Sequence, residues 1–305
     1  MTPLLLLAAL GAWVTLPFVP ALREAHRRRD AAPLAVADRY DEDRHHGPDA
    51  TAPPERGASV ARGGVAPAAL GTTLVANRTF RGDPGLALDA LRVGGVARLA
   101  PGTVVRDRLA VGESVAVGAG SALSGSVEAG RTLWLGAGCR FERVHAPTVR
   151  VEGGPAATLA PTRPARPVAL PDGTLAGAGR ALVAGDLHLD DGARYDGDLV
   201  VTGSLSLGAG AWVRGSVKAH GSLALGPDAV VEGSAFADGD LDLGAQAEVA
   251  GVAAAGGTLH LGPASRVGRP NAPATAAGRR VVAEGGAVVH GTLWAEEDGR
   301  TEGAE

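Results

Sequence analysis

The stretch GDLVVTGSLSLGAGAWVRGSVKAHGSLALGPDAVVEGSAFADGDL, residues 197–241, repeats a pattern every 18 residues. Glycine recurs at this spacing, and leucine follows each of these glycines two and four positions later. Apolar pairs also recur every six residues, so each repeat contains three of them. The three columns are Gly185, Gly203, Gly221, Gly239 and Gly257; Leu187, Leu205, Leu223, Leu241 and Leu259; and Leu189, Leu207, Leu225, Leu243 and Leu261.

This periodicity predicts both the secondary structure and the way in which it stacks. Two apolar residues at positions i and i+2 lie on one face of a β-strand. Three such strands, joined by glycine-containing corners, make one triangular coil, and coils stacked about 4.8 Å apart pair each strand with its neighbours above and below. The sequence therefore predicts an all-β fold, a parallel β-helix (β-solenoid) of 18-residue coils with three short strands each.

The phase of the apolar pairs divides the chain. It predicts a first β-helix segment over residues 85–151 and a second over residues 181–296. The Pro/Gly-rich stretch 152–180 interrupts the phase as a loop, and residues 269–280 form a second loop within the later segment. One long solenoid with two loops and two abutting solenoids both fit this pattern. Residues 297–305 follow as an acidic tail.

The N-terminal residues predict a membrane anchor. The stretch from Met1 to Leu22 carries no charged side chain, and it is long enough for a helix to cross a bilayer. Arg23 and the arginines at 27–29 follow it, and no basic residue precedes it. The positive-inside rule then predicts a single-pass anchor, residues 1–29, in the inner (cytoplasmic) membrane, with the β-helix in the cytoplasm. Residues 30–84, which mix charged, Pro and Ala residues without periodicity, are predicted to be a disordered linker.

Composition excludes several functional classes. The formal charge of -4 argues against a nucleic-acid partner, and a single cysteine excludes a disulfide framework and a thiolate zinc site. No nucleotide, metal or other cofactor motif is present, so no cofactor is predicted. Cys139 falls on the inward phase, and we expect a buried, inert thiol. Asp186, Asp198 and Asp240 follow corner glycines, where we expect them to bond the local backbone.

The repeats resemble those of the bactofilins, which are polymer-forming bacterial cytoskeletal proteins. The shared features are strands that begin with Gly-Asp or Gly-Ser followed by alternating apolar residues, and A-x-V-x-G corners. The resemblance is strongest over residues 181–268 and weaker over 91–151. It implies a right-handed β-helix that assembles end to end without a nucleotide and is often attached to the inner membrane by its N-terminus. Family polymerisation rests on apolar terminal coils, which implies self-association at Leu91, Val93, Leu293 and Ala295.

We therefore expect a membrane-anchored scaffold that forms a homo-oligomer or homopolymer and localises client proteins, which the sequence does not identify. Unpaired strand edges at solenoid ends give an independent reason to expect self-association, since proteins must cap or pair such edges. Outward-facing Trp134, Trp212 and Trp294 are candidates for a lateral contact surface.

Two other functions compete with this expectation. Hexapeptide-repeat acyltransferases, which are left-handed β-helices, have a similar six-residue period, and VGAGSA from Val117 and LGAGCR from Leu135 match their repeat. Catalysis would require a positioned histidine, and no partner can be assigned to any, so no catalytic residue is predicted. An exported structural β-solenoid is the second alternative. The five histidines within the predicted β-helix segments, none of which is assigned a catalytic role, are His145, His188, His220, His260 and His290.

Overall fold

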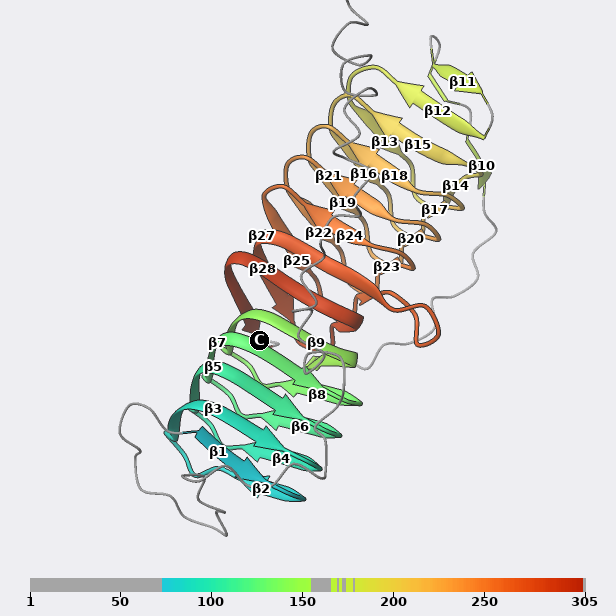
Figure 1. Cartoon of the computed structure of the whole chain (residues 1–305). Coiled ribbons are helices and arrows are strands. Elements are labelled where there is room, and N and C mark those ends of the chain that lie inside the picture. Colours follow the sequence, from blue (N-terminus) through green and yellow to red (C-terminus); the bar gives the residue numbers. More distant parts are fainter. Residues whose placement is uncertain (1–72, 155–165, 169, 172–173, 178, 304–305) are drawn as a thin grey trace, which may run out of the picture. The chain divides into compact units, whose positions relative to one another are not determined.

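In a computed structural model, residues 73–154, 166–168, 170–171, 174–177 and 179–303 are described, and all of their regular structure is β-strand (Figure 1). The all-β solenoid predicted from the repeat is thus confirmed. The described residues include no helix long and apolar enough to cross a membrane. The predicted anchor, residues 1–29, and most of the predicted linker lie outside the described residues.

The first segment begins in the stretch that was predicted to be linker. Leu74 and Ala76 point inward from its first strand, and their register partners are Leu91 and Val93, one residue short of the 18-residue repeat. This shortened coil explains why the periodicity did not reveal the segment's true start at Thr73. Its strands are β1 (Thr73–Ala76), β2 (Thr79–Arg81), β3 (Ala87–Val93), β4 (Val96–Leu99), β5 (Val104–Val111), β6 (Ser114–Val117), β7 (Ala122–Ala129), β8 (Thr132–Leu135) and β9 (Arg140–Val151).

The second segment begins at β12 (Arg180–Val183). It runs through strands that are two to four residues long except for the last two, and each strand before the last pairs in parallel with a strand one coil further on. They are β13 (Leu187–Leu189), β14 (Ala193–Tyr195), β15 (Asp198–Val201), β16 (Leu205–Leu207), β17 (Trp212–Val213), β18 (Val217–Ala219), β19 (Leu223–Leu225), β20 (Val230–Val231), β21 (Ala235–Ala237), β22 (Leu241–Leu243), β23 (Glu248–Val249), β24 (Ala253–Ala255), β25 (Thr258–Leu261), β26 (Arg266–Val267), β27 (Ala274–Glu284) and β28 (Val288–Glu302).

Three predicted boundaries of this part of the chain are wrong. Residues 274–280 of the expected second loop belong to β27, because Ala276 fills the inward position above Ala253. The expected acidic tail is strand as far as Glu302, since Thr301 is inward and buried. The stretch 152–180 contributes two short strands, β10 (Arg166–Pro167), which pairs with β14, and β11 (Leu175–Gly177), which pairs with β12.

The core is a column of small aliphatic side chains inside the coils. Most of the pairs at i and i+2 are buried, for example Leu205 and Leu207 at 1% and 2% exposure, whereas Tyr195 and Ala255 are half-buried. Because each coil encloses only three such pairs, leucine, valine and alanine fill most of the space, and Phe80 and Phe141 are the only buried phenylalanines among the described residues.

The corners are held by a ladder of side-chain to backbone hydrogen bonds. Asp186 Oδ1 accepts from the Ser204 amide (2.7 Å), and Ser204 Oγ accepts from the Ser222 amide (3.2 Å). Ser222 and Asp240 continue the same column, the latter accepting from the Thr258 amide at 2.7 Å. The corner aspartates thus accept hydrogen bonds from the backbone, but the expectation that these partners are local is wrong, because they lie one full coil away.

The crowded ladder also requires glycine at these corners. A Cβ atom built on Gly221 would lie 2.5 Å from Ser204 Oγ and 3.0 Å from its amide nitrogen. Gly221 does not have a positive φ, so crowding by the preceding coil, and not backbone conformation, explains glycine at this position; Gly185, at the start of the column, is uncrowded and has a positive φ of 82°.

The two segments meet at their C-terminal coils. Strand β28 pairs in parallel with β27 on one side and antiparallel with β9 on the other (Figure 1). Amide to carbonyl hydrogen bonds cross this junction from Val151 to Ala287 (3.0 Å) and from Thr301 to Cys139 (2.9 Å). The stack of coils is therefore continuous, but the chain runs in opposite directions in its two halves. Neither of the two architectures expected from the sequence includes this reversal.

Candidate functional site

The four residues predicted at the self-association ends do not lie at the ends. Leu91 and Val93 are in β3 and are covered by β1. Leu293 and Ala295 are in β28, between β27 and β9 at the junction. All four side chains are at most 1% exposed. Their assignment to the ends is wrong because the first coil starts earlier and because the last coil is paired within the chain.

The ends that remain are the starting coils of the two segments. Among the described strands, β1 pairs only with β3 and β2 only with β4, so both have a free edge. At the other end, β11 covers the edge of β12 and β10 covers the edge of β14. In that coil, β13 pairs only with β16 among the described residues. The first starting coil is thus the more open of the two.

An apolar row runs along one outer face of the second segment. Successive register pairs place one outward residue of each strand above the next, from β11 to β28. All four large hydrophobic residues that are exposed among the described residues belong to it: Leu175 (71%), Leu182 (36%), Phe236 (38%) and Trp294 (50%). We name it the apolar row; in order, its members are Leu175, Leu182, Val200, Lys218, Phe236, Ala254, Ala277 and Trp294.

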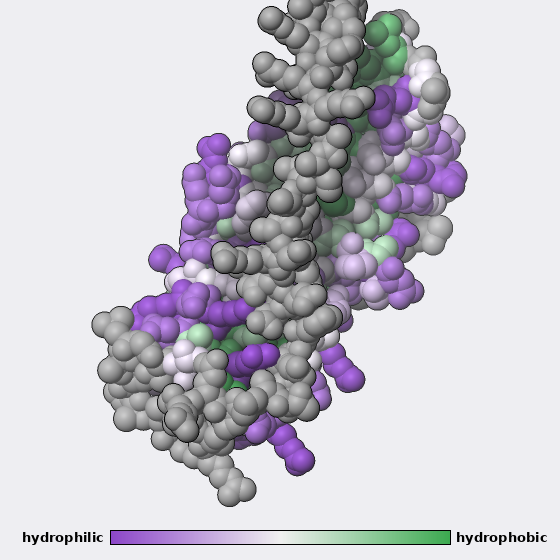
Figure 2. Space-filling view, in the orientation of Figure 1, coloured by the Kyte–Doolittle hydropathy of each residue, from purple (hydrophilic) through white to green (hydrophobic). Residues whose placement is uncertain are grey.

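The single charged member of the apolar row does not interrupt its surface. Lys218 Nζ lies 3.5 Å from Asp238 on the polar margin, and the aliphatic stem of a lysine can cover apolar neighbours while its ammonium stays solvated. His220 Nδ1 also lies 2.7 Å from Asp238, and this hydrogen bond lowers the pKa of the carboxyl group. In Figure 2, hydrophobic surface near the β11–β12 end is bordered by hydrophilic side chains. A contiguous apolar surface of this kind marks an interaction site more often than scattered exposed residues do.

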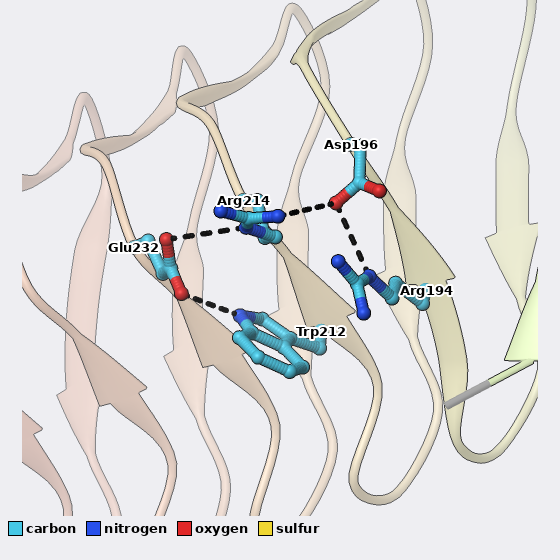
Figure 3. Close-up of polar contacts among 5 residues, drawn as sticks. All are labelled: Arg194, Asp196, Trp212, Arg214 and Glu232. Atoms are coloured by element: carbon cyan, nitrogen blue, oxygen red, sulfur yellow. Dashed lines mark hydrogen bonds and ion pairs between the residues drawn. The ribbon is translucent and has the colours of Figure 1, made fainter. Parts of the chain in front are cut away.

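The tryptophans do not form one lateral surface, as the sequence had suggested. Trp294 belongs to the apolar row, whereas Trp212 and Trp134 lie on a different face, in β17 and β8. Trp212 is held there in a polar network (Figure 3). Arg194 Cζ lies 5.0 Å from the centroid of the Trp212 ring, and Trp212 Nε1 donates a hydrogen bond to Glu232 at 3.1 Å. Arg214 bridges Glu232 and Asp196, at 3.8 and 3.7 Å. These contacts tie three coils together.

One group of polar residues has the types found in hydrolases. His188 Nδ1 lies 2.7 Å from Ser206 Oγ, and its Nε2 lies 3.8 Å from Asp190. The side chains of His188 and Asp190 are 63% and 94% exposed. A nucleophilic hydroxyl requires a water-excluding site around its base, and side chains as exposed as these do not form one.

The remaining histidines have structural partners. His260 lies between Asp242 (2.9 Å) and Glu284 (2.8 Å), and the hydrogen bond to Asp242 raises its pKa. His145 Nδ1 lies 2.9 Å from Thr292 Oγ1 across the junction. His290 lines an open pocket of about 590 Å³ together with Glu248, Arg266 and Arg269, and burial lowers its pKa. Within the described ranges, no cluster of three or more His, Cys, Asp or Glu residues could hold a metal ion.

Cys139 is buried in the column, as predicted from its inward phase. Desolvation raises the pKa of its thiol, which favours the unreactive protonated form.

The chain matches no protein-family model, and neither a curated protein nor a solved structure is similar enough to count as a match.

Proposed function

We propose that this chain is a bactofilin-like scaffold without enzymatic activity, which self-associates through the free ends of its β-solenoid and which residues 1–29 hold at a membrane. The supporting observation is the β9–β28 junction. It uses both C-terminal coils within one chain, so that the ends left among the described residues are both starting coils. Head-to-tail growth would require a free C-terminal coil, and we therefore propose contacts between like ends.

The edge of β1 is suited to such a contact. Gly94 donates its amide hydrogen to the Ala76 carbonyl (2.8 Å), so Ala76 directs its backbone groups toward β3. Alternate residues of a strand direct these groups to opposite sides, and Val75 therefore presents its N–H and C=O at the free edge. Two copies related by a two-fold axis would pair these edges antiparallel, as β9 and β28 pair within the chain.

The second end is less accessible to a partner, because β10 and β11 already pair with two of its three strands. We propose that the basic assembly is a two-fold dimer through β1 and β2, and that growth into longer polymers requires β10 and β11 to leave the second end. Client proteins would then be arrayed along a rigid, membrane-attached rod.

The uncharged stretch Met1–Leu22 and the arginines after it support the membrane part of the proposal. We propose the topology that their order favours, with the solenoid on the cytoplasmic side, and the right-handed winding that the bactofilin resemblance implies. A reporter fused to Glu305 tests this topology. Cytoplasmic activity of an intact chain is expected, whereas a periplasmic reporter or a cleaved N-terminus would favour the exported β-solenoid instead.

Self-association is tested by the mass of the purified full-length chain in sedimentation experiments. We expect a dimer, and we expect Val75→Pro to make it monomeric, because proline removes the N–H that would pair across the β1 edge. His188→Pro is the matched control. The Leu187 amide and the Leu189 carbonyl bond to the coil of β16, so His188 presents its own backbone groups at the free edge of β13, at the other end of the stack. This variant should remain dimeric; a monomeric wild-type chain, or equal effects of both prolines, would contradict the proposed contact.

A further inference from the structure

An open pocket of about 590 Å³ lies beside the junction of the two segments. Its walls are formed by Glu248 of β23, Arg266 of β26, His290 of β28 and the loop 268–272. We propose that this pocket binds the phosphate monoester of a sugar or polyol. The inference goes beyond the scaffold function and does not depend on the β1 contact, because β1 and β2 lie at the opposite end of the first segment.

Two arginines in the pocket have hydrogen-bond donors that the protein does not use. Arg266 Nη2 and Arg269 Nε each lie 3.7 Å from a carboxylate oxygen of Glu248, which is an ion-pair distance but too long for a hydrogen bond. Arg266 Nε is shielded from solvent and has no hydrogen-bond partner among the described residues. A purely structural ion-pair cluster is expected to satisfy such a donor. Guanidinium groups bind phosphate through paired N–H donors, so these two side chains fit a phosphate ligand.

The charges around the pocket match those of a phosphate monoester. Arg266 and Arg269 line the pocket, and Arg150 of β9 lies close enough to act on His290. Burial, with smaller contributions from the charges of Arg150 and Arg266, lowers the pKa of His290, so its ring is mainly neutral at pH 7. The three arginines and Glu248 therefore give a net charge of about +2, and a phosphate monoester carries about −1.5 to −2 at pH 7.

The same pocket presents hydrogen-bond acceptors, which call for hydroxyl groups on the ligand. His290 Nδ1 lies 3.3 Å from both the Pro147 carbonyl oxygen and Thr148 Oγ1. The carbonyl can only accept, so this contact favours the tautomer with hydrogen on Nδ1, which leaves Nε2 as an acceptor. Glu248 supplies further acceptor oxygens. A volume of about 590 Å³ is typical of small-molecule sites, and a sugar or polyol on the phosphate supplies both the hydroxyls and the bulk.

The loop that carries Arg269 is held in place by its own backbone. The amides of Arg269 and Ala272 donate to each other's carbonyl oxygens at 3.0 Å and close a two-residue turn. Gly268 starts this loop with a positive φ of 75°, and a Cβ there would lie 2.7 Å from the His290 carbonyl oxygen. Arg269 therefore extends from a defined backbone position, which reduces the entropy lost when a ligand binds.

Isothermal titration calorimetry of the purified full-length chain, in a buffer without phosphate, tests the proposal. The probes are glucose 6-phosphate, inorganic phosphate and glucose. We expect glucose 6-phosphate to bind at one site at least tenfold more tightly than inorganic phosphate, and glucose to show no measurable binding. No saturable binding of glucose 6-phosphate, or an affinity no higher than that of inorganic phosphate or of glucose, would overturn the proposal.

Arg269→Ala and Arg279→Ala form a matched pair of variants. Nε of each arginine lies 3.7 Å from a glutamate, and the side chains are 53% and 57% exposed, but Arg279 pairs with Glu297 outside the pocket. Arg269→Ala should weaken the binding of glucose 6-phosphate about tenfold, as expected for the loss of a charge-assisted hydrogen bond, whereas Arg279→Ala should leave it unchanged. Equal losses in the two variants would show general charge attraction and would overturn the assigned site.

Glu248→Gln separates the binding of the phosphate from that of the hydroxyl groups. Loss of the negative charge should strengthen the binding of inorganic phosphate, whereas the preference for glucose 6-phosphate over inorganic phosphate should fall severalfold because a strong acceptor is lost. An unchanged preference would overturn the sugar or polyol assignment. The mass of each variant in sedimentation experiments should equal that of the wild type, so a failure of this site remains distinguishable from a failure of the β1 contact.

Discussion

Thr301 of β28 bonds to the backbone of Cys139 of β9, in the place that a residue of the next coil would occupy within one segment. The Cys139 amide donates a 2.9 Å hydrogen bond to Thr301 Oγ1, and the same hydroxyl donates at 2.6 Å to the Gly136 carbonyl. Within the first segment, the Ser121 hydroxyl likewise accepts from the Thr103 amide one coil earlier, although it donates to the Gly118 carbonyl of its own coil. A residue from the far end of the chain thus completes a column that the first segment began, and this joins the two halves in a defined register.

Removal of the Thr301 hydroxyl should weaken the junction. Thr301→Val keeps the shape but leaves the buried Cys139 amide without its acceptor, and we expect a loss of about 1–3 kcal/mol in the free energy of unfolding. Thr301→Ser retains the hydroxyl and should cost less than about 1 kcal/mol, mainly through the lost methyl group. Urea unfolding followed by circular dichroism measures both. Equal losses for the two variants would show that the hydroxyl does not hold the junction.

Crowding at the corners predicts an asymmetric response to alanine. Gly221→Ala would place its Cβ against the Ser204 hydroxyl and backbone, and we expect a loss of about 1–3 kcal/mol in the free energy of unfolding. Gly177→Ala is the control, because nothing lies within 4 Å of its added Cβ. This variant should stay within about 0.5 kcal/mol of the wild type. Thermal unfolding measures both variants, and an equal decrease of the two unfolding midpoints would contradict the account.

The contributions of His260 and His290 to folding stability are expected to depend on pH in opposite directions. Hydrogen bonding to Asp242 raises the pKa of His260 in the folded state, so its contribution to stability is fully present below the unfolded pKa of about 6.5 and is lost as pH rises through the folded pKa. Burial lowers the pKa of His290, so its contribution is present above about pH 6.5 and is lost as pH falls through the folded pKa.

Glutamine variants measure these contributions. Relative to the wild type, His260→Gln should be more destabilising at about pH 5.5 than at about pH 8.5, and His290→Gln should show the reverse order. Urea unfolding at the two pH values provides the comparison. The same pH trend in both variants would contradict the assigned environments.

The sequence was sufficient to predict the coil but not the path of the chain. Pairs such as Leu205 and Leu207 reveal the inward face because a strand alternates its side chains and the narrow core is filled mainly by aliphatic residues. The junction could not be predicted, since the apolar pattern of β9 and β28 is the same whether their neighbour runs parallel or antiparallel. The start at Thr73 was missed because a coil shortened by one residue shifts the phase.

The candidate surfaces were predicted less well than the fold for a related reason. Leu293 and Ala295 were assigned to an end from their position in the chain, but the last coil is covered by β9. The apolar row was missed because its spacing changes along the chain. Its members recur every 18 residues from Leu182 to Ala254, but Ala277 and Trp294 follow only through the irregular spacing that β27 introduces. Locating that spacing in advance would have revealed the row.

Self-association through the first starting coil is tested most directly by electron microscopy of the purified full-length chain beside its Val75→Pro variant. The account predicts wild-type particles in which two solenoids join end to end at their β1–β2 coils, and Val75→Pro particles of half that length. Wild-type particles containing one solenoid, or particles joined side by side or through the β13 end, would contradict it.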